Sequence, residues 1–581
     1  MKIKHLFGLA VIAAMTASCS SNEDLGTAGP GTGTNEAGVG YATFTINLPS
    51  VSGTRAADAG GAEMNEGTPE EYAVKSATAL IFQEYGSDEG SYKFVESVTL
   101  TIGGWTNDET DGITTTSKKL VAKLTNVDTK NDYSVLILLN NTKVALPTVG
   151  QSYNDWNSKN ILTLSATDWA GSDGFYMANA PLKGSAASPA TLVPIDKGKI
   201  YASEAKAKED ASECAATVFV ERGVAKMTVA TPGTTGTIIV KDKANPTDTT
   251  KKSEVKFSNW ALDITNKKTY AVHNIDGLSA DYDKIWNTDP SNRFIGTNNR
   301  VYWGKDPNYK LTELNTADDV NDAKRKEEFN FITATSDINK AFDMPVYCLE
   351  NTFNLDNMYQ GQTTRVIFKA KYAPKNDAGV SLAEKDGTFY TIGNMTTILK
   401  KADLEKAVDA AATSVLSGCT VDYTNLETEG GSHVITLADI KDATGATLVA
   451  GTDYSGKTGT QIINEINDKL GLKDGRDEAK VGINTYAQGV TYYIARVKHF
   501  GDALTKWNSG ESYSGKNDKY LGRYGMLRNN WYELTVGNVY GPGYPGVPPV
   551  DPTLPDDENE KYLSVSVKIL SWAKRSQSVD L

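Results

Sequence analysis

The segment Tyr41-Ala-Thr-Phe-Thr-Ile-Asn-Leu48 carries the strongest short-range signal in the chain. Its apolar residues alternate with polar ones, and this period of two is typical of a β-strand with one buried face. Pro49 follows at once and ends the strand, because proline cannot donate a hydrogen bond to a sheet. The side chains expected on the buried face are those of Ala42, Phe44, Ile46 and Leu48.

The composition on both sides of this strand differs from that of a packed domain. Residues 20–40 are mostly Gly, Ser, Thr and acids, and residues 52–61 are again small and polar. Such segments are typical of flexible tethers. A strong strand therefore lies between two tether-like segments, an arrangement that an ordinary domain start does not need.

The composition of the whole chain indicates a turn-rich β protein. The chain has 581 residues, of which 51 are Gly, 28 are Tyr and only 4 are His. Its net charge is −13, so no basic surface is available to neutralise phosphates, and nucleic-acid binding is disfavoured. The four cysteines are too few for a disulfide scaffold.

Alternating or apolar runs separated by turn residues continue through the chain and predict a mainly β fold. Two β-sandwich-like domains are expected, the second with helical insertions. A lysine- and acid-rich stretch at 206–213 is interpreted as the joint between them. Strands are predicted at 77–83, 94–102, 133–139, 217–220, 225–230, 363–372, 490–500 and 532–536, and helices at 403–416 and 461–470.

The N-terminus has the features of an export signal. Lys2 and Lys4 precede an apolar run, 6–15, that is too short to span a bilayer. The sequence Thr16-Ala17-Ser18-Cys19 then resembles a bacterial lipobox, in which Cys19 would be acylated and become the new N-terminus. The alternative is an ordinary secretory signal that is cut near Ser18. The sequence Asn22-Glu23-Asp24 resembles an acidic tag for the outer cell surface.

The C-terminus repeats the pattern of an isolated strand. Six prolines in 541–560 favour a polyproline II arm, which at about 3.1 Å per residue would extend about 60 Å. A strand follows in which apolar and polar residues alternate, and the arm is expected to hold this strand away from the body. Its apolar residues are Leu563, Val565, Val567 and Ile569, with Trp572 three positions further on.

Motifs that suggest chemistry are weak. The sequence Gly451-Thr-Asp-Tyr-Ser-Gly456-Lys457-Thr458 fits the phosphate-binding loop pattern, but no strand that ends in a magnesium-binding Asp accompanies it. The stretch 107–112 begins like a calcium loop, but Lys118 stands where the bidentate acid is needed. We therefore expect no cofactor, no metal site and no catalytic residue.

Histidine and cysteine give no further signal. The histidines show no zinc spacing, and His433 beside Ser432 is better explained as a strand-end residue than as part of a catalytic triad. The Tyr492-Tyr493 pair is better explained by packing than as a sugar platform. The sequence Asp248-Thr-Thr resembles a bacterial O-glycosylation site, but it is too short to be specific. Cysteines 214, 348 and 419 are expected to be buried small apolar residues.

Short motifs along most of the chain together resemble the fimbrillin family, the subunits of type V pili, and within it the shaft subunits of minor, short fimbriae. The sequence Gly53-Thr54-Arg55-Ala56 looks like the family's maturation site, where an arginine-specific, trypsin-like protease cuts after Arg55. The other matching segments are Cys19-Ser20, 220–226, 490–499, 528–532, and 565–572 with the final Val579-Asp580-Leu581.

The resemblance implies transthyretin-like sandwiches and a defined order of segments. Residues 1–18 would be the signal peptide and 19–55 a lipidated propeptide with a removable strand. Residues 56–215 and 216–540 would be the N- and C-terminal domains. Residues 541–560 would be the arm, and 561–581 the donor strand.

The resemblance also implies a mechanism. Cleavage between Arg55 and Ala56 would release the strand that bears Phe44, and the C-terminal strand of an identical subunit would fill the groove. The chain would begin as an outer-membrane lipoprotein precursor and end in a cell-surface fimbria that supports adhesion and biofilm formation. Anchor and tip subunits, the protease, and host or bacterial surface ligands would be its partners.

Two other classes stay open at this point. A monomeric surface lipoprotein that binds glycans or host proteins would keep Cys19 acylated and Arg55 uncut. A secreted enzyme has no positive signal. The strand at 41–48 could also be an ordinary first strand of the sandwich, and the C-terminal strand could pair within its own subunit.

Overall fold

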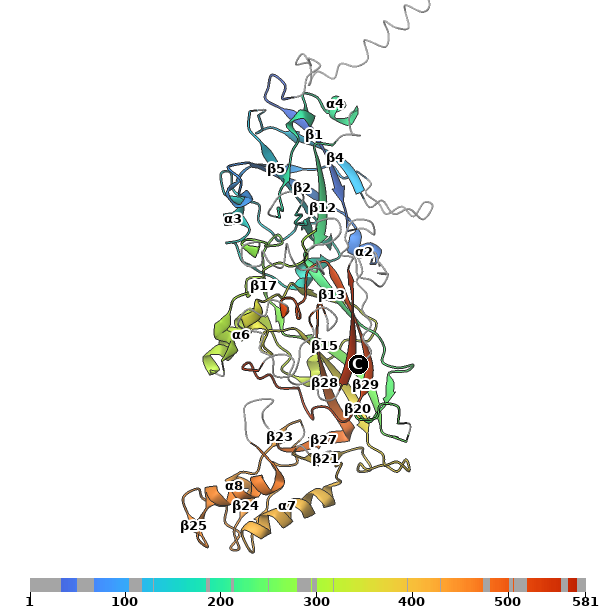
Figure 1. Cartoon of the computed structure of the whole chain (residues 1–581), viewed down its shortest axis with the longest axis vertical. Coiled ribbons are helices and arrows are strands. Elements are labelled where there is room, and N and C mark those ends of the chain that lie inside the picture. The colour runs from blue at the N-terminus through green and yellow to red at the C-terminus, as the bar shows by residue number, and fades with distance from the viewer. Residues whose placement is uncertain are drawn as a thin grey trace, which may run out of the picture.

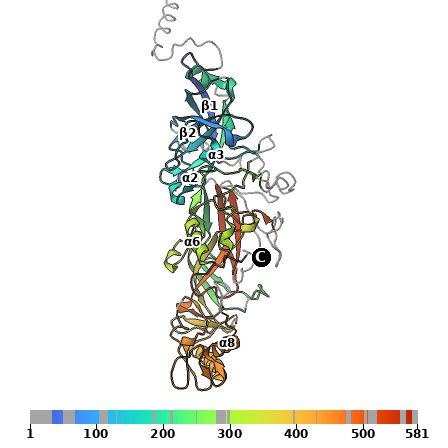
Figure 2. The same ribbon diagram turned by 90° about the vertical axis from the view of Figure 1, so that its left-hand side faces the viewer.

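The computed structural model is an elongated molecule of three successive bodies, with the N-terminal sheet at one end and a helical subdomain at the other (Figure 1). The three bodies stay end to end when the view is turned by 90° (Figure 2). The structure describes residues 33–49, 67–103, 117–128, 130–183, 189–209, 214–248, 250–278, 294, 300–316, 318–393, 395, 397–428, 430–473, 481–500, 505, 520–554 and 563–571.

The first body is built on a nine-stranded sheet in the order β11-β1-β12-β9-β5-β2-β3, with β10 paired to β5 and β4 paired to β1. The strand β12 connects its two halves, because Ala216 to Phe219 pair with β1 and Val220 to Arg222 pair with β9. Side chains of β1, β2 and β5 share one core. The strands are β1 (Gly40–Asn47), β2 (Ala77–Gln83), β3 (Lys93–Thr99), β4 (Ser117–Leu124), β5 (Tyr133–Leu139), β9 (Met177–Asn179), β10 (Val193–Pro194), β11 (Ile200–Tyr201) and β12 (Ala216–Arg222).

The second body contains two four-stranded sheets, β19-β13-β29-β30 and β14-β15-β20-β28. Both contribute to one core, in which Met227 and Leu534 of the first sheet join Phe257 and Phe368 of the second. This is the sandwich that the strand pattern predicted. Its strands are β13 (Val224–Val229), β14 (Thr237–Ile239), β15 (Glu254–Asp263), β19 (Val346–Leu349), β20 (Arg365–Ala373), β28 (Val490–Arg496), β29 (Asn530–Val539) and β30 (Leu563–Ser571).

The third body is the helical insertion, with its own small core. It contains α7 (Lys401–Val415) and α8 (Gly459–Leu470), together with the sheet β21-β27-β23. Helix α8 starts with a capping box between Thr458 and Gln461 and ends at Gly471, whose φ of 66° a residue with a side chain would rarely adopt. Its sheet consists of β21 (Phe389–Ile392), β27 (Ile483–Tyr486) and β23 (Ser432–His433).

The domain boundary expected at 215/216 lies one strand too early. The strand β12, which begins at Ala216, belongs to the first sheet, and β13 belongs to the second. Only Gly223 separates the two strands, and a Cβ atom there would lie 2.5 Å from the Trp169 ring, so the close approach requires glycine. Residues 206–209 of the stretch interpreted as a joint belong to α4 (Glu204–Glu209), which packs against β1, and residues 210–213 lie outside the described residues.

A buried ion pair connects the first two bodies. Glu71 in α2 (Pro69–Tyr72) accepts hydrogen bonds from Lys226 Nζ at 2.7 Å and from the Tyr347 hydroxyl at 2.6 Å, and both partners belong to the second body. A second buried cluster is formed by Glu221 in β12, which lies 2.7 Å from His273 Nδ1 and pairs with Arg300. The contacts of Glu71 with Lys226 and Tyr347 join the first body to the second.

The Glu221 cluster predicts acid sensitivity. Burial alone would raise the pKa of Glu221, but His273 and Arg300 outweigh it and lower that pKa from 4.5 to about 2. A lowered folded-state pKa gives stability that is present above pH 4.5 and is lost as the pH falls toward 2, here about 3 kcal/mol. Urea unfolding at pH 7, 4 and 3 measures this loss.

Glu221→Gln is the control for this prediction. It should unfold more easily at pH 7, by about 3–5 kcal/mol, because the buried Arg300 and His273 lose their carboxylate partner. It should lose less stability than the wild type between pH 4.5 and 2. Equal losses in the two proteins would contradict the assignment.

Candidate functional site: the slot of strand β1 and the C-terminal strand

Strand β1 lies in the interior of its sheet. It pairs antiparallel with β4 along its whole length, from Gly40 opposite Leu124 to Asn47 opposite Ser117. On its other side, β11 pairs with its first half and β12 runs parallel to its second half. The strand predicted at 41–48 is therefore confirmed, and its removal would leave a slot with hydrogen-bonding groups on both walls.

The side chains of β1 fill the core of the first body. Ala42, Phe44 and Ile46 are fully buried, and Leu48 is nearly so. Thr43, on the opposite face, donates from its hydroxyl to the Ala207 carbonyl of α4 at 2.8 Å. Both faces of the strand are thus covered, as in the interior of a domain.

A large-to-small change in this strand should destabilise the full-length protein. Phe44→Ala removes a fully buried ring from the middle of the core, and such changes cost about 3–5 kcal/mol. Thr45→Ser, at a half-buried position of the same strand, is the matched control and should stay close to wild type. Chemical unfolding of the full-length protein measures both, and a small effect of Phe44→Ala would contradict the placement of β1 in the core.

The predicted cleavage residues Arg55 and Ala56, like Cys19, lie outside the described residues. The structure does fix what flanks them. On one side is β1, and on the other is α2, anchored by Glu71 to the second body. The two flanks therefore belong to separate structural elements, and a cut between them would leave α2 in place.

The C-terminal strand is not held away from the body, contrary to our expectation. The backbone of β30 pairs antiparallel with β29 over nine registered residue pairs, from Val539 opposite Leu563 to Asn530 opposite Ser571. It forms the edge of the sheet β19-β13-β29-β30. The sequence left open whether this strand pairs within its own subunit, and the structure shows that it does. Trp572 lies outside the described residues.

The proline-rich arm also differs from the sequence-based expectation. Instead of extending into solvent, residues 541–554 run along the second body and contact β20 and β28. Asp551 is buried, and the Tyr544 backbone makes two hydrogen bonds with Tyr492, at 2.7 and 2.8 Å. The arm is therefore part of the folded domain as far as Leu554.

The phosphate-loop pattern at 451–458 forms a hairpin. The strands β25 (Asp453–Tyr454) and β26 (Lys457–Thr458) pair across a turn at Ser455 and Gly456, both with positive φ. Lys457 is 2.5 Å from Glu465 of α8 and so forms an ion pair there. This turn chemistry explains the Gly and Lys in the motif without a nucleotide.

The cysteines and the other candidate ligand residues do not form a functional site among the described residues. Cysteines 214, 348 and 419 are free thiols, of which 348 and 419 are buried as expected and Cys214 is half-buried. Among the residues that the structure describes, no cluster of His, Cys, Asp or Glu could hold a metal ion. The calcium-like stretch 107–112 lies outside those residues. None of the helices in the described ranges has the length and apolar character needed to cross a membrane.

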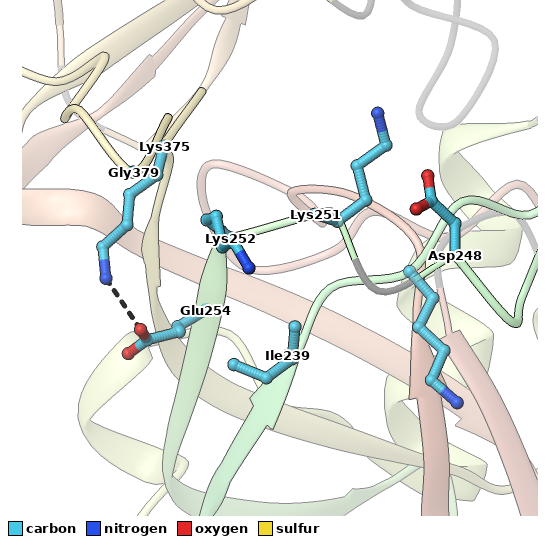
Figure 3. Close-up of a pocket in the computed structure, with 8 residues that line it drawn as sticks. Ile239, Asp248, Lys251, Lys252, Glu254, Lys375 and Gly379 are labelled. Atoms are coloured by element: carbon cyan, nitrogen blue, oxygen red, sulfur yellow. Dashed lines mark hydrogen bonds and ion pairs between the residues drawn. The ribbon is translucent and has the colours of Figure 1, made fainter. Parts of the chain in front are cut away.

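An open pocket of about 440 Å³ lies beside β14 and β15 and is lined by several lysines (Figure 3). Lys375 pairs with Glu254 at 2.7 Å, and Lys251 pairs with Asp377 at 3.7 Å. Figure 3 shows that the side chains of Lys251, Lys252 and Lys375 point in different directions. The cations do not converge, so the pocket does not form a built anion site.

Comparison with known protein families finds a similarity at the C-terminal end of the chain. Residues 484–578 match the family model described as "Major fimbrial subunit protein type IV, Fimbrillin, C-terminal". This segment contains β28, β29, the proline-rich arm and β30. Among curated proteins, none matches the chain.

One matching solved structure is a fimbrial assembly protein from Parabacteroides distasonis ATCC 8503. It is 10% identical, and the match covers 62% of this chain and 93% of that chain with a TM-score of 0.25. A likeness at this level carries no argument about the fold. The similarity to the fimbrillin family therefore rests on the C-terminal region of the chain, which includes the strand pair β29–β30 at the centre of the site described above.

Proposed function

We propose that this protein is a fimbrial subunit that polymerises head to tail by donor-strand exchange after proteolysis. The observation that carries the proposal is the position of β1. It is an interior strand with partners on both sides. The segment that joins β1 to α2 contains Arg55, which is the single Lys or Arg between Cys19 and Lys75. One cut there would separate the strand from the rest of the protein.

The proposed slot can accept a β-strand of the type found at the C-terminus. The core face of β1 carries Phe44 and Ile46 at alternate positions, and β30 has Val565, Val567 and Ile569 in the same spacing. Burying each of these aliphatic or aromatic side chains is worth roughly 1.5–3 kcal/mol. An incoming strand would therefore recover about what the outgoing strand gives up, and irreversible cleavage would set the direction.

Both reactive edges are covered in the uncut subunit. While β1 is in place, the edges of β4 and β12 are paired, and while β30 lies on β29 the proposed donor strand is paired too. Exposed unpaired edges promote aggregation. The precursor would therefore remain monomeric until it reaches the protease.

The geometry of the contact favours a filament. The slot is in the first body and the donor strand leaves from the second, so each subunit would use two different surfaces. A contact between different surfaces generates open chains of subunits unless it closes into a ring. The elongated arrangement of the bodies in Figure 1 suits a shaft of stacked subunits.

The lipobox-like sequence completes the proposed pathway. Cys19 would anchor the precursor in the outer membrane, and cleavage after Arg55 would release the mature subunit from its lipid. An arginine-specific, trypsin-like protease, anchor and tip subunits, and host or bacterial surface ligands would then be partners. Adhesion and biofilm formation would follow from the assembled fimbria.

N-terminal sequencing of the protein sheared from the cell surface tests this pathway. A chain that begins at Ala56 supports maturation at Arg55. An acylated Cys19 on all the surface material would contradict it and would favour an anchored monomeric lipoprotein.

A further inference from the structure

Residues 541–554, which we name the strap, are fixed to the second body by contacts along their whole length. We propose that the strap stays in place during assembly, that Arg365 positions it, and that only the chain beyond Leu554 changes partner. This inference rests on the strand exchange proposed above. It assigns the strap the task of setting where the donor strand leaves the subunit.

Arg365 connects the strap to the sheet. It is at the start of β20 and is 1% exposed. Its Nη1 and Nη2 atoms donate to the carbonyl oxygens of Pro549 and Pro548 at 3.0 and 2.6 Å, and its Nε donates to Asp263 at 2.8 Å. The guanidinium therefore binds two consecutive proline carbonyls. A lysine cannot reproduce this, because its ammonium group lacks the planar pair of donors.

The first part of the strap lies against β28 and the end of β27. The hydroxyls of Tyr493 and Tyr486 donate to the carbonyls of Gly541 and Gly543, at 2.9 and 2.8 Å. A Cβ atom on Gly543 would lie 2.0 Å from the Tyr492 carbonyl oxygen, so the backbones approach too closely for any side chain. These close contacts support a strap that remains bound to the body of the subunit.

The second part of the strap ends beside α6 (Asp319–Glu328). The Val550 side chain packs against the cluster that contains Leu314 and Phe329, next to that helix. A Cβ atom on Gly361 would meet Pro552, and the Gln360 amide donates to the Leu554 carbonyl at 3.0 Å. The last fixed point of the strap is therefore on the flank of the central sandwich, where Figure 1 shows α6.

A fixed strap shortens the reach of the donor strand. Residues 555–562 separate Leu554 from β30, and eight residues span at most about 30 Å when fully extended. A free arm of residues 541–560 would reach about 60 Å. The slot of the next subunit must then come within about 30 Å of Leu554, so the subunit contact forms beside α6 and the 359–363 loop.

A disulfide across the strap tests the inference. Tyr492 and Tyr544 form an isolated antiparallel bridge, and the Cα separation of about 5.5 Å in such hydrogen-bonded pairs suits a disulfide. Tyr492→Cys with Tyr544→Cys, in a Cys214→Ser background, would lock the strap when oxidised. Protease-treated protein should form filaments equally well when oxidised or reduced, as seen by electron microscopy and sedimentation.

The outcomes separate this inference from the proposed function. Filaments from the reduced form alone would show that the strap must detach, which overturns the inference and leaves strand exchange intact. Absence of filaments from cleaved wild-type protein would instead overturn the proposed function. Arg365→Lys provides a second test that needs no disulfide.

Arg365→Lys keeps a cation opposite Asp263 but loses the fork that holds the Pro548 and Pro549 carbonyls. Hydrogen exchange of the Tyr544 amide should speed up at least tenfold, while amides of Phe368 in β20 stay as slow as in the wild type. Filaments should become irregular in subunit spacing. Unchanged exchange at Tyr544 together with regular filaments would overturn the role of Arg365.

Discussion

Protein with Arg55→Ala is expected to stay monomeric under treatment with a trypsin-like protease, whereas the same treatment is expected to convert the wild-type protein into filaments. Between Cys19 and Lys75, Arg55 is the only residue after which such a protease can cut. Without that cut, β1 remains covalently joined to α2, and its interior position between β4 and β12 keeps the slot filled. Sedimentation and electron microscopy of treated protein measure the effect.

The control for this experiment is Arg55→Lys. Trypsin should cut this variant and restore filaments, whereas an arginine-specific protease should not. Mass spectrometry of the soluble fraction should find the fragment with β1 only where filaments form. Filaments from Arg55→Ala at the wild-type rate would contradict removal of β1 by cleavage at this residue.

The same arrangement explains how much the sequence could predict. The alternation in Tyr41 to Leu48 identified β1, because a strict period of two has a single structural meaning in a short segment. The helices predicted at 403–416 and 461–470 were also confirmed, as α7 and α8. In α8, a capping box and a terminal glycine mark the two ends of the helix in the local sequence. Apolar–polar alternation and helix end signals therefore predicted these elements correctly.

The partner of a strand is not a local property. The alternation of Leu563 to Ile569 predicted a strand but could not say that it pairs with β29 of the same subunit. The boundary error at 215/216 has a similar origin. One glycine is enough for the chain to pass from the first sheet to the second, and no break in composition marks it.

The strap shows why composition can mislead. Six prolines favour an extended arm in water, and the sequence supports that expectation. The residue that holds the strap, Arg365, is more than 180 positions away, because it bonds to Pro548 and Pro549 across separations of 183 and 184 residues. A single sequence contains no signal for such a contact. The glycines at 543 and 546, where a side chain would clash with neighbouring backbone, were a local hint of close packing.

The second large effect concerns β30. A disulfide that joins β30 to β29 should abolish filament formation in protein that has been cut after Arg55, and reduction should restore it. Thr535 and Ser566 are opposite each other in the register of the two strands, and Thr535 is exposed, so Thr535→Cys with Ser566→Cys leaves the core untouched. The Cα separations of antiparallel pairs fit a disulfide.

The physical reason for this prediction is that one strand cannot occupy two places. In the isolated subunit β30 satisfies the hydrogen-bonding edge of β29, and in the proposed filament the same strand fills the slot of a neighbour. Exchange therefore requires that the pairing with β29 breaks, and a covalent bond across that pair prevents it. The strap lock at Tyr492 and Tyr544 is the matched comparison, because it places a disulfide in the same domain and should have no effect. Filaments from the oxidised β29–β30 lock would mean that subunits join without releasing this strand, and the slot of β1 would then need another occupant.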